Sequence, residues 1–383
     1  MPDFQTSILL RYHSLLQSSE PKADYNLYNM TKLDAPADAV LPRGSLVLVT
    51  GITGLIGAHV ADQALQYGYR VRGVVRDLEK AHWLEDFFAA KYGQGAYEPF
   101  LAPDQGTKGA LDKAMEGVSG VVHVASIMSM STEYDEVVPP VSSFALNAIE
   151  SAFNTPSVKR FVYTSSSAAA LYPVPLDKQI HVTIDAFNDK AVDLARRPPP
   201  HDAMQGVWVY AASKTLAERA VLDFARERGA ERPNFAVNTV LPDLILGPPL
   251  SPANQGFPTS ASVLEKIFKA DPSRMSLPPS HWVDVRDVAR LHLAGLLGPD
   301  LKSERIFGYC GLQDDALLVD TFKKLFPDRE FVHGSQTAGE NRSIIDGSPR
   351  AEVLLKWLGR SGWSTLEDSL KDFGDSVLTL EKS

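Results

Sequence analysis

One stretch near the start of the globular region constrains the fold most, because an apolar, β-branched run leads directly into three closely spaced glycines. Residues 46–57 read LVLVTGITGLIG, and residues 58–65 continue as AHVADQAL. This order predicts a buried strand, a tight turn and a helix. Gly51 allows the sharp reversal, Gly54 leaves the backbone open to a phosphate, and Gly57 lets the helix pack close to the strand. We expect the turn and the helix N-terminus to bind a pyrophosphate, with an ordinary glycine turn as the alternative.

The second predicted strand, residues 69–76, carries the residues that distinguish two nucleotides. In a dinucleotide-binding fold its end faces the adenosine ribose, where an acidic residue would bond the 2′-hydroxyl. This chain has Arg76 there and Lys80 one helical turn later. Two cations suit a 2′-phosphate and favour NADP over NAD. Asp77, directly after Arg76, keeps open the alternative of two solvated surface charges.

Strand-like and helix-like segments continue to alternate along the chain. Further strands are predicted at the segment that ends at 100–104, at 118–126 with its exit loop, at 160–168 and at 238–242, and helices at 111–115, 140–154 and 209–218. The alternation predicts an α/β fold with a doubly wound parallel sheet, whose ligands gather at the carboxyl ends of the strands. We therefore expect Asp104 near the adenine and the small residues Ala125 and Ser126 beside the cofactor. His123 lies inside an apolar strand and is expected to be a core histidine.

Tyr210 and Lys214 lie four residues apart on a predicted helix and so share one face. A free phenol has a pKa near ~10 and is a poor acid or base at neutral pH. A nearby ammonium favours the phenolate, so we expect Lys214 to lower the pKa of Tyr210 and also to hold the nicotinamide ribose. Ser166, in the serine cluster after the strand at 160–168, is placed to bond a substrate oxygen. This set predicts hydride transfer between a nicotinamide and a carbonyl carbon, with Tyr210 passing the proton.

Three motifs together resemble those of the extended short-chain dehydrogenase/reductases, a Rossmann-type family: TGITGLIG at 50–57, TSS at 164–166 and YAASK at 210–214. Within that family the chain is similar to the group of dihydroflavonol reductase, cinnamoyl-CoA reductase and yeast methylglyoxal/aldehyde reductase, over about residues 45–375. The resemblance implies a catalytic set of Ser166, Tyr210 and Lys214, with Ser167 as the fallback for Ser166. The cofactor-binding residues expected for NADP (NADPH) are Gly51, Thr53, Gly54, Leu55, Ile56, Gly57, Arg76, Lys80, Asp104, Ala125, Ser126, Tyr210, Lys214, Pro242 and Leu244.

The chain departs from the family pattern in two places. The family's fourth catalytic residue, an asparagine, has no obvious counterpart in Val141-Ser142-Ser143-Phe144, and its role stays unassigned. The segment between Ser166 and Tyr210 is long, and we expect an insertion near 173–207. It either covers the mouth of the active site or forms a surface loop without substrate contact.

The expected domain boundaries lie where the alternation of predicted strands and helices begins and ends. Residues 1–43 are expected to be an N-terminal extension with a short amphipathic helix near 8–16 and a surface linker. Residues 44–245 are expected to form mainly the NADP-binding domain. Residues 246–383 are expected to form mainly a smaller substrate lobe, with 281–298 returning to the core and Asp284 and Arg286 tying the lobes together. The candidates for an apolar substrate pocket are Met128, Met130, Trp208, Phe257 and Trp282, although each taken singly is better explained as a core residue than as a ligand contact.

Composition narrows the class of protein. The chain of 383 residues is 44% apolar, so it can bury a full core, and its net charge of -9 argues against a nucleic-acid partner. The single cysteine, Cys310, is expected inside a strand and excludes an intramolecular disulfide framework. No apolar run reaches membrane-spanning length, and we expect a cytoplasmic monomer or homodimer that needs no metal.

The leading hypothesis for function is NADPH-dependent reduction of an aldehyde or ketone of modest size. The first alternative is a nucleotide-sugar epimerase or dehydratase on the same fold. Ser165-Ser166 in place of an acidic pair argues against a dehydratase, and Ala169-Ala170-Leu171-Tyr172 departs from the sequence that epimerases carry after the serines. The second alternative is a binding protein that senses NADP without catalysis, although it would not need to keep Tyr210 and Lys214.

Overall fold

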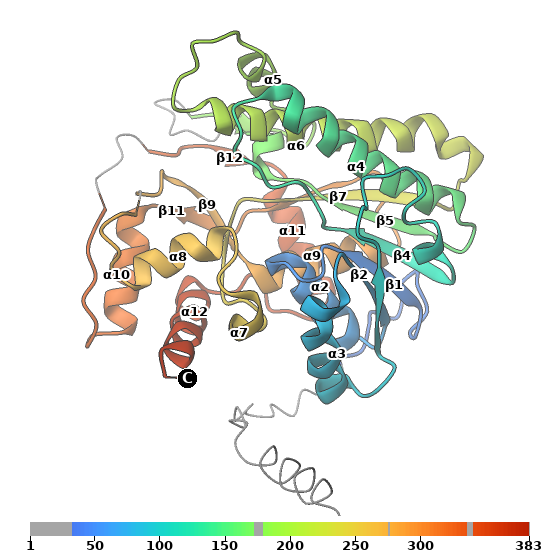
Figure 1. Cartoon of the computed structure of the whole chain (residues 1–383), viewed down its shortest axis with the longest axis horizontal. Helices are drawn as coiled ribbons and strands as arrows, with labels where there is room; N and C mark the ends of the chain where they lie inside the picture. The colour runs from blue at the N-terminus through green and yellow to red at the C-terminus, as the bar shows by residue number, and fades with distance from the viewer. Residues whose placement is uncertain (1–32, 172–178, 275, 335–339, 383) are drawn as a thin grey trace, which may run out of the picture. The chain divides into compact units, whose positions relative to one another are not determined.

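The computed structural model describes residues 33–171, 179–274, 276–334 and 340–382, which belong to one compact unit. Residues 1–32 form a separate unit outside the described residues, and the helix expected near 8–16 lies there. Figure 1 shows the described unit as a central sheet with helices on both of its faces.

The central sheet has seven strands in the order β10-β7-β5-β4-β1-β2-β3, and every neighbouring pair is parallel. Its strands are β1 (Leu46–Thr50), β2 (Arg70–Val75), β3 (Tyr97–Leu101), β4 (Val118–His123), β5 (Arg160–Thr164), β7 (Ala236–Pro242) and β10 (Arg305–Gly308). All residues of β1, β5 and β7 are buried, as expected of strands covered on both faces. The predicted doubly wound parallel sheet is confirmed, although β3 ends three residues before Asp104.

Helices cover the two faces of the sheet through two separate apolar clusters. One face carries α2 (Leu55–Gln66), α3 (Leu78–Tyr92), α9 (Val285–Leu297) and α11 (Ser348–Trp357). The other carries α4 (Tyr134–Asn154), α5 (Asp189–Ala195) and α6 (Gln205–Arg228), and the short 3-10 turn η1 (Lys113–Met115) stands where a helix was expected at 111–115.

Helix α4 begins at Tyr134, so the expected start at Pro140 was wrong. Proline is favoured in the first helical turn and disfavoured inside a helix, so a start before Pro139 and Pro140 is not the one that local preference indicates. In the structure Pro139 and Pro140 lie inside the helix, and the buried side chains of Val137 and Val138 pack the earlier turn against the core.

A second, smaller lobe is built from segments after β7. Its three-stranded sheet has the order β11-β9-β8, with β8 (Leu244–Leu246), β9 (Ser280–Asp284) and β11 (Gly311–Gln313). Its helices are α7 (Pro252–Gln255), α8 (Ser260–Phe268), α10 (Asp315–Leu325) and α12 (Leu366–Glu381), and the last three share one apolar cluster around Phe268 and Phe322. The returning segment is longer than 281–298, because β10 and α11 also lie in the central domain.

Buried polar contacts fasten the returning segment to the second lobe. The Asp284 carboxylate accepts hydrogen bonds from the Arg286 side chain and from the Ser369 hydroxyl of α12 at 2.6 Å. Arg286 also pairs with Asp372 on α12. A two-stranded parallel pair, β6 (His181–Val182) and β12 (Ile344–Ile345), similarly joins the expected insertion to the C-terminal part of the chain.

Two smaller expectations were wrong. The end of the expected surface linker packs against the core: Leu41 is buried, and the Val40 N–H donates to the Leu297 carbonyl at 2.9 Å. Cys310 lies between β10 and β11, not inside a strand, and is half-buried. Burial raises the pKa of its thiol to about 12, so the thiol stays protonated at neutral pH. Among the described helices, none has the length and apolar character needed to cross a lipid bilayer.

Candidate active site

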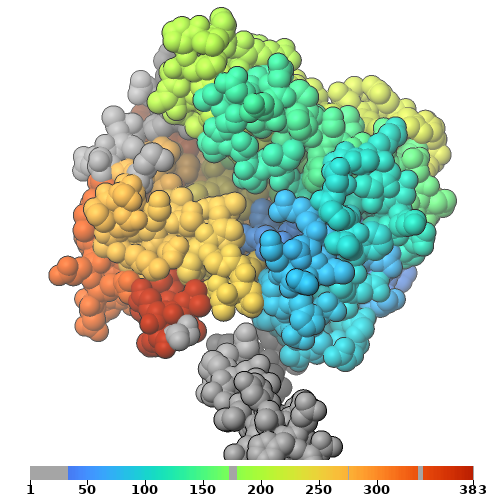
Figure 2. Space-filling view, viewed as in Figure 1, coloured from blue at the N-terminus to red at the C-terminus, as the bar shows by residue number. Residues whose placement is uncertain are grey.

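A cleft of about 1040 Å³ opens at the carboxyl ends of the central strands, between the two lobes. Figure 2 shows the surface hollowed between the yellow α7–α8 segment, the blue region of α2 and the green region of α4. The glycine turn after β1 lines one end, and side chains from β5, α6 and the segment after β7 line the other. We call these the glycine-turn end (Gly51, Thr53, Gly54 and Gly57) and the tyrosine end (Ser166, Tyr210, Lys214 and Asp243).

The glycine turn is shaped by backbone contacts that leave no room for side chains. Gly51 has a φ of +65°, and a Cβ built there would lie 2.8 Å from the Ala125 nitrogen. A Cβ on Gly57 would lie 2.2 Å from the Gly51 carbonyl oxygen. The N-cap of α2, Gly54, supplies no capping side chain, so the helix N-terminus keeps free N–H groups on the cleft. This glycine cradle fits the pyrophosphate of a dinucleotide.

Thr50 fastens the neighbouring loop to this turn. Its hydroxyl oxygen accepts hydrogen bonds from the Val124 and Ala125 N–H groups, both at 3.1 Å. The same hydroxyl lies 2.9 Å from Nδ1 of His123, which is buried and stacks on Tyr163. Burial lowers the pKa of His123 to about 3, so it is a neutral core histidine, as the sequence predicted.

The cleft brings together nearly all the expected cofactor-binding residues. Those on its lining are Gly51, Thr53, Gly54, Leu55, Ile56, Gly57, Arg76, Asp104, Ala125, Ser126, Tyr210, Lys214, Pro242 and Leu244. Lys80 is not on it: its side chain is 85% exposed, and its Nζ lies 3.8 Å from Asp77, which caps α3. Asp104 accepts from the Gly106 N–H and the Thr107 hydroxyl, which lower the pKa of its carboxyl.

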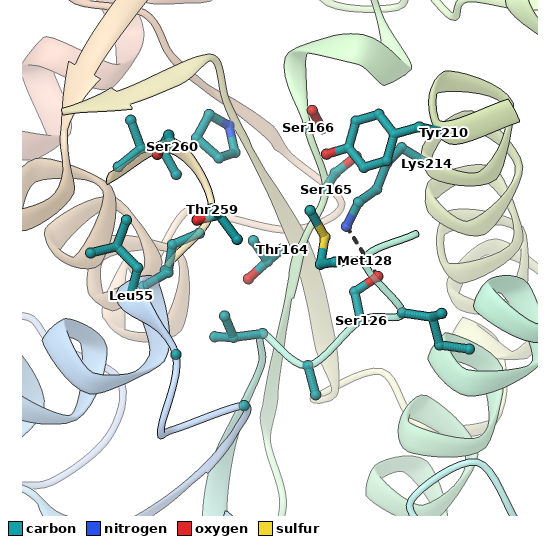
Figure 3. Close-up of a pocket in the computed structure, with 18 of the residues that line it drawn as sticks. Leu55, Ser126, Met128, Thr164, Ser165, Ser166, Tyr210, Lys214, Thr259 and Ser260 are labelled. Carbon is teal, nitrogen blue, oxygen red and sulfur yellow. Dashed lines mark hydrogen bonds between the residues drawn. The ribbon is translucent and has the colours of Figure 1, made fainter. Parts of the chain in front are cut away.

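At the tyrosine end, Ser166, Tyr210 and Lys214 lie close together (Figure 3). The Lys214 ammonium donates to the Ser126 hydroxyl at 3.3 Å. Burial lowers the pKa of Lys214 to about 8, against the opposing effect of the Glu218 carboxylate. Burial raises the pKa of Tyr210, while a hydrogen bond with the Ser166 side chain acts in the opposite direction. The pKa of Tyr210 is thus raised overall, because desolvation of the phenolate dominates, and the lowering effect expected of Lys214 stays a prediction.

The three adjacent serines point to three different partners. The Ser165 hydroxyl donates to the Glu218 carboxylate at 2.9 Å, inside a buried network in which Arg305 also donates to Glu218 at 2.9 Å. The Ser167 hydroxyl donates to Asp243 at 2.9 Å. Ser166 accepts a weak hydrogen bond of 3.3 Å from the Ala168 N–H and lies beside Tyr210. Of the three, Ser166 alone keeps its hydroxyl proton uncommitted to a carboxylate in the described structure.

Comparison with known proteins identifies the family. Residues 47–307 match the model of the NAD dependent epimerase/dehydratase family. The chain belongs to this family. It is 40% identical to aldehyde reductase 2 of Sporidiobolus salmonicolor, over 90% of this chain and 98% of that protein. It is 34% identical to ketoreductase adrE of Penicillium rubens, over 87% of this chain and 96% of that protein.

A solved structure agrees with this assignment. The crystal structure of Gre2 from Candida albicans in complex with NADPH superposes with a TM-score of 0.74. The two chains are 27% identical, and the match covers 88% of this chain and 99% of Gre2. The resemblance to the extended reductases that the sequence motifs indicated is therefore confirmed for family and fold.

Two residues of this family member escaped the sequence analysis, one that holds the glycine turn from outside the cleft lining and one on the lining itself. Gln255 of α7 donates to the carbonyl oxygens of Thr53 and Gly54, both at 3.1 Å, and so fastens the second lobe to the glycine turn. Asp243 lines the tyrosine end, where burial raises the pKa of its carboxyl to about 6. Gln255 lies some 200 positions from its partners, so no local signal reveals it. Asp243 stands between two expected residues, Pro242 and Leu244, and its charge inside a buried segment was a usable signal.

The expected substrate pocket was mostly wrong. Met128 lines the cleft, but Trp208 and Trp282 are buried in the core and Phe257 packs against Phe373 at 5.3 Å between ring centres. Met130 is exposed on the surface. Apolar side chains that do line the cleft include Ile127, Met128, Phe144, Leu171, Val207, Leu277, Pro278 and Pro279. Val207 comes from the expected insertion, of which residues 173–178 lie outside the described chain.

Proposed function

We propose that this oxidoreductase reduces an aldehyde or ketone to an alcohol, with NADPH as the hydride donor and Tyr210 as the proton donor. The assignment as an NADP-dependent reductase rests on the family, on the relatives named aldehyde reductase and ketoreductase, and on the neighbour that binds NADPH. The individual roles of the residues rest on their placement in the cleft.

One observation carries the proposal: a serine hydroxyl that no carboxylate accepts lies beside a protonated phenol at one end of a cleft whose other end is a glycine cradle. Ser165 and Ser167 both donate to carboxylates, which leaves Ser166 to donate to a substrate carbonyl oxygen. The raised pKa of Tyr210 keeps its phenol protonated at neutral pH, as a proton donor requires.

Each residue of the cleft then has its own role in binding or in proton transfer. Ser166 holds the carbonyl oxygen, and Tyr210 gives that oxygen its proton as negative charge develops on it. Lys214 carries the positive charge nearest the reacting groups, and its hydrogen bond to Ser126 fixes the ammonium on the cleft. Arg76, on the lining at the glycine-turn end, is the residue that we assign to the 2′-phosphate. Bound NADPH supplies the hydride that reduces the carbonyl carbon.

The lining favours a substrate of modest size with apolar bulk. Met128 is 58% exposed and reaches the cleft beside Lys214 and Ser126 (Figure 3). Phe144 lines the cleft in the stretch of α4 where the family's asparagine was sought, so an apolar ring occupies part of that place. An exposed apolar side chain at a cleft mouth is stabilised when an apolar ligand covers it.

The test is NADPH consumption by the full chain with a panel of aldehydes, diketones and aryl ketones. A nucleotide sugar is assayed separately to test the epimerase alternative. We expect NADPH to be oxidised in one-to-one proportion to alcohol for at least one carbonyl compound. Conversion of the nucleotide sugar without net NADPH oxidation would favour the epimerase alternative. Tight NADPH binding with no turnover of any substrate would favour the non-catalytic sensor.

A further inference from the structure

Asp243 is a buried carboxylate on the cleft that the proposed reaction does not use. It lies between β7 and β8, at the carboxyl end of a central strand. Its Oδ1 accepts from the Ser167 hydroxyl at 2.9 Å, and its Oδ2 accepts from the His281 N–H at 3.0 Å. These two bonds fix the carboxylate between the serine loop and the second lobe.

The charge of Asp243 is not balanced by a cation. Among the described residues, the one basic group within ion-pairing distance is His281, whose Nδ1 lies 3.9 Å away. Burial lowers the pKa of His281 to about 4, so this ring is neutral at neutral pH. An anion that no cation neutralises acts on other ionisable groups in the same water-poor cleft.

The Tyr210 phenol and the Lys214 ammonium are the ionisable groups that share the tyrosine end of the cleft with Asp243. Asp243 binds Ser167, and the phenol lies on the adjacent Ser166. The Asp243 charge raises the pKa of Tyr210, in addition to the effect of burial. The other polar groups around the two residues come from five elements: Ser166 and Ser167 of the serine loop, Tyr163 of β5, Lys214 of α6, His281 of β9, and Tyr309 after β10. Tyr309 and Tyr163 are themselves kept neutral by burial, and the Glu218–Arg305 pair is already neutralised.

We propose that Asp243 is a positioning residue that acts through Tyr210: its fixed negative charge keeps the phenol protonated and so extends upward the pH range in which the site can donate a proton. The inference rests on the proposed reductase function. It does not change the equilibrium between carbonyl and alcohol; it sets which protonation state of Tyr210 is populated. Asp243 itself ionises near pH 6, so the effect is present above that pH and fades below it.

The decisive variant is Asp243→Asn, because the amide keeps the shape of the side chain and can accept from the His281 N–H. In this variant we expect the alkaline limb of carbonyl reduction to move to lower pH, and alcohol oxidation with NADP⁺ to set in at lower pH. A unit charge in a partly shielded site shifts the pKa of a neighbouring group by on the order of half to one unit. At a fixed pH on the limb of reduction or of oxidation, the rate should therefore change roughly threefold or more.

Three variants separate charge from structure. Asp243→Glu keeps the charge and should restore the wild-type pH profile. Ser167→Ala removes a hydrogen bond but keeps the carboxylate, and should not move the limb to lower pH. Asp193→Asn removes an exposed carboxylate on α5 and is the matched control for net charge. Equal shifts in Ser167→Ala and Asp243→Asn, or no shift in Asp243→Asn, would overturn the inference.

A spectroscopic measurement reports on Tyr210 without turnover. In protein carrying ¹³Cζ-labelled tyrosine, the Tyr210 resonance is identified by its absence in Tyr210→Phe. At each pH, its ionised fraction should be higher in Asp243→Asn than in the wild type. Rates that change without a change in this fraction would show that Asp243 acts by another route. Full reductase activity in Tyr210→Phe would instead refute the proton donor of the proposed function, whatever the Asp243 variants do.

Discussion

At the glycine-turn end of the cleft, the lining includes glycines, and its cation Arg76 is exposed to solvent. Gly51 and Gly57 leave no space for a Cβ there. At the tyrosine end the lining consists of side chains, and Ser166, Lys214 and Asp243 are all largely withdrawn from water. The first end therefore selects its ligand by shape, whereas the second sets the ionisation of its groups by burial.

The difference has an energetic consequence. A backbone cradle made of glycine costs conformational entropy on folding but buries no charge. A buried ammonium and a buried, unbalanced carboxylate are unfavourable in the folded state, as their shifted pKa values record. We expect removal of the buried Lys214 charge to abolish activity while raising stability, and substitutions in the glycine turn to lower both.

The largest expected effect is that of Tyr210→Phe, which removes only the hydroxyl. General acid–base catalysis contributes roughly 10²–10⁴-fold, so kcat for carbonyl reduction should fall by about that factor. NADPH affinity, measured by calorimetry, should stay within about twofold of the wild type, because the ring still fills its site. A near-normal kcat would show that Tyr210 is not the proton donor. The tyrosine end would then be only part of a nucleotide-binding cleft.

The second effect is on stability. Burial lowers the pKa of Lys214 from 10.5 to about 8, so below pH 8 the folded protein holds a charge that the unfolded chain accommodates more readily. Lys214→Met should therefore raise the free energy of unfolding at pH 7 by on the order of 3 kcal/mol, while activity is lost.

The stability gain of Lys214→Met should depend on pH in a defined direction. The penalty is fully present below pH 8 and fades as the pH rises toward 10.5, because in this range the folded protein has released the Lys214 proton while the unfolded chain still binds it. The stability gain of Lys214→Met in urea unfolding should accordingly be smaller at pH 9.5 than at pH 7. Lys80→Met, at an 85% exposed side chain, is the control and should show little change at either pH. A destabilised Lys214→Met would mean that the ammonium supports the fold.

The third effect concerns the glycine turn. A Cβ at Gly57 would lie 2.2 Å from the Gly51 carbonyl oxygen, whereas one at Gly54 would lie 3.3 Å from the same atom. Gly57→Ala should lower the free energy of unfolding by about 1–3 kcal/mol and weaken NADPH binding. Gly54→Ala needs only a small shift and should cost clearly less in stability. If chemical unfolding and calorimetry ranked the two the other way, the cradle would not be shaped by these contacts.

The smallest effects are expected at the exposed cations. Arg76 lies on the cleft, and Lys80 points into solvent beside Asp77. Charge-assisted hydrogen bonds contribute more when they are shielded from water, so Arg76→Ala should weaken NADPH binding about tenfold relative to NADH binding. Lys80→Ala should change that ratio by only about twofold. Titration of both cofactors against each variant checks this order, and equal losses for NADPH and NADH in Arg76→Ala would reject the assignment to the 2′-phosphate.

Much of the fold was predictable because its signals are local. An apolar run followed by Gly51, Gly54 and Gly57 is compatible with few structures other than a strand, a turn and a helix. The repeated alternation of strands and helices likewise indicates a parallel sheet covered by helices. The start of α4 was not predictable, because a proline pattern that favours one boundary was overruled by the burial of Val137 and Val138 against the core. The apolar pocket failed for a similar reason: Trp208, Phe257 and Trp282 are as suitable for packing as for ligand contact, and tertiary packing used them in the core or partly buried against it.

The sequence by itself determined the glycine turn, the shared helical face of Tyr210 and Lys214, and the serine cluster, since each depends on backbone stereochemistry or on a spacing of a few residues. Only the tertiary structure decided which serine lies beside Tyr210 without donating to a carboxylate, because the partners of Ser165 and Ser167 come from α6 and from the end of β7. It also decided that the pKa of Tyr210 is raised, because desolvation is a property of everything packed around a group and not of its neighbours in the chain.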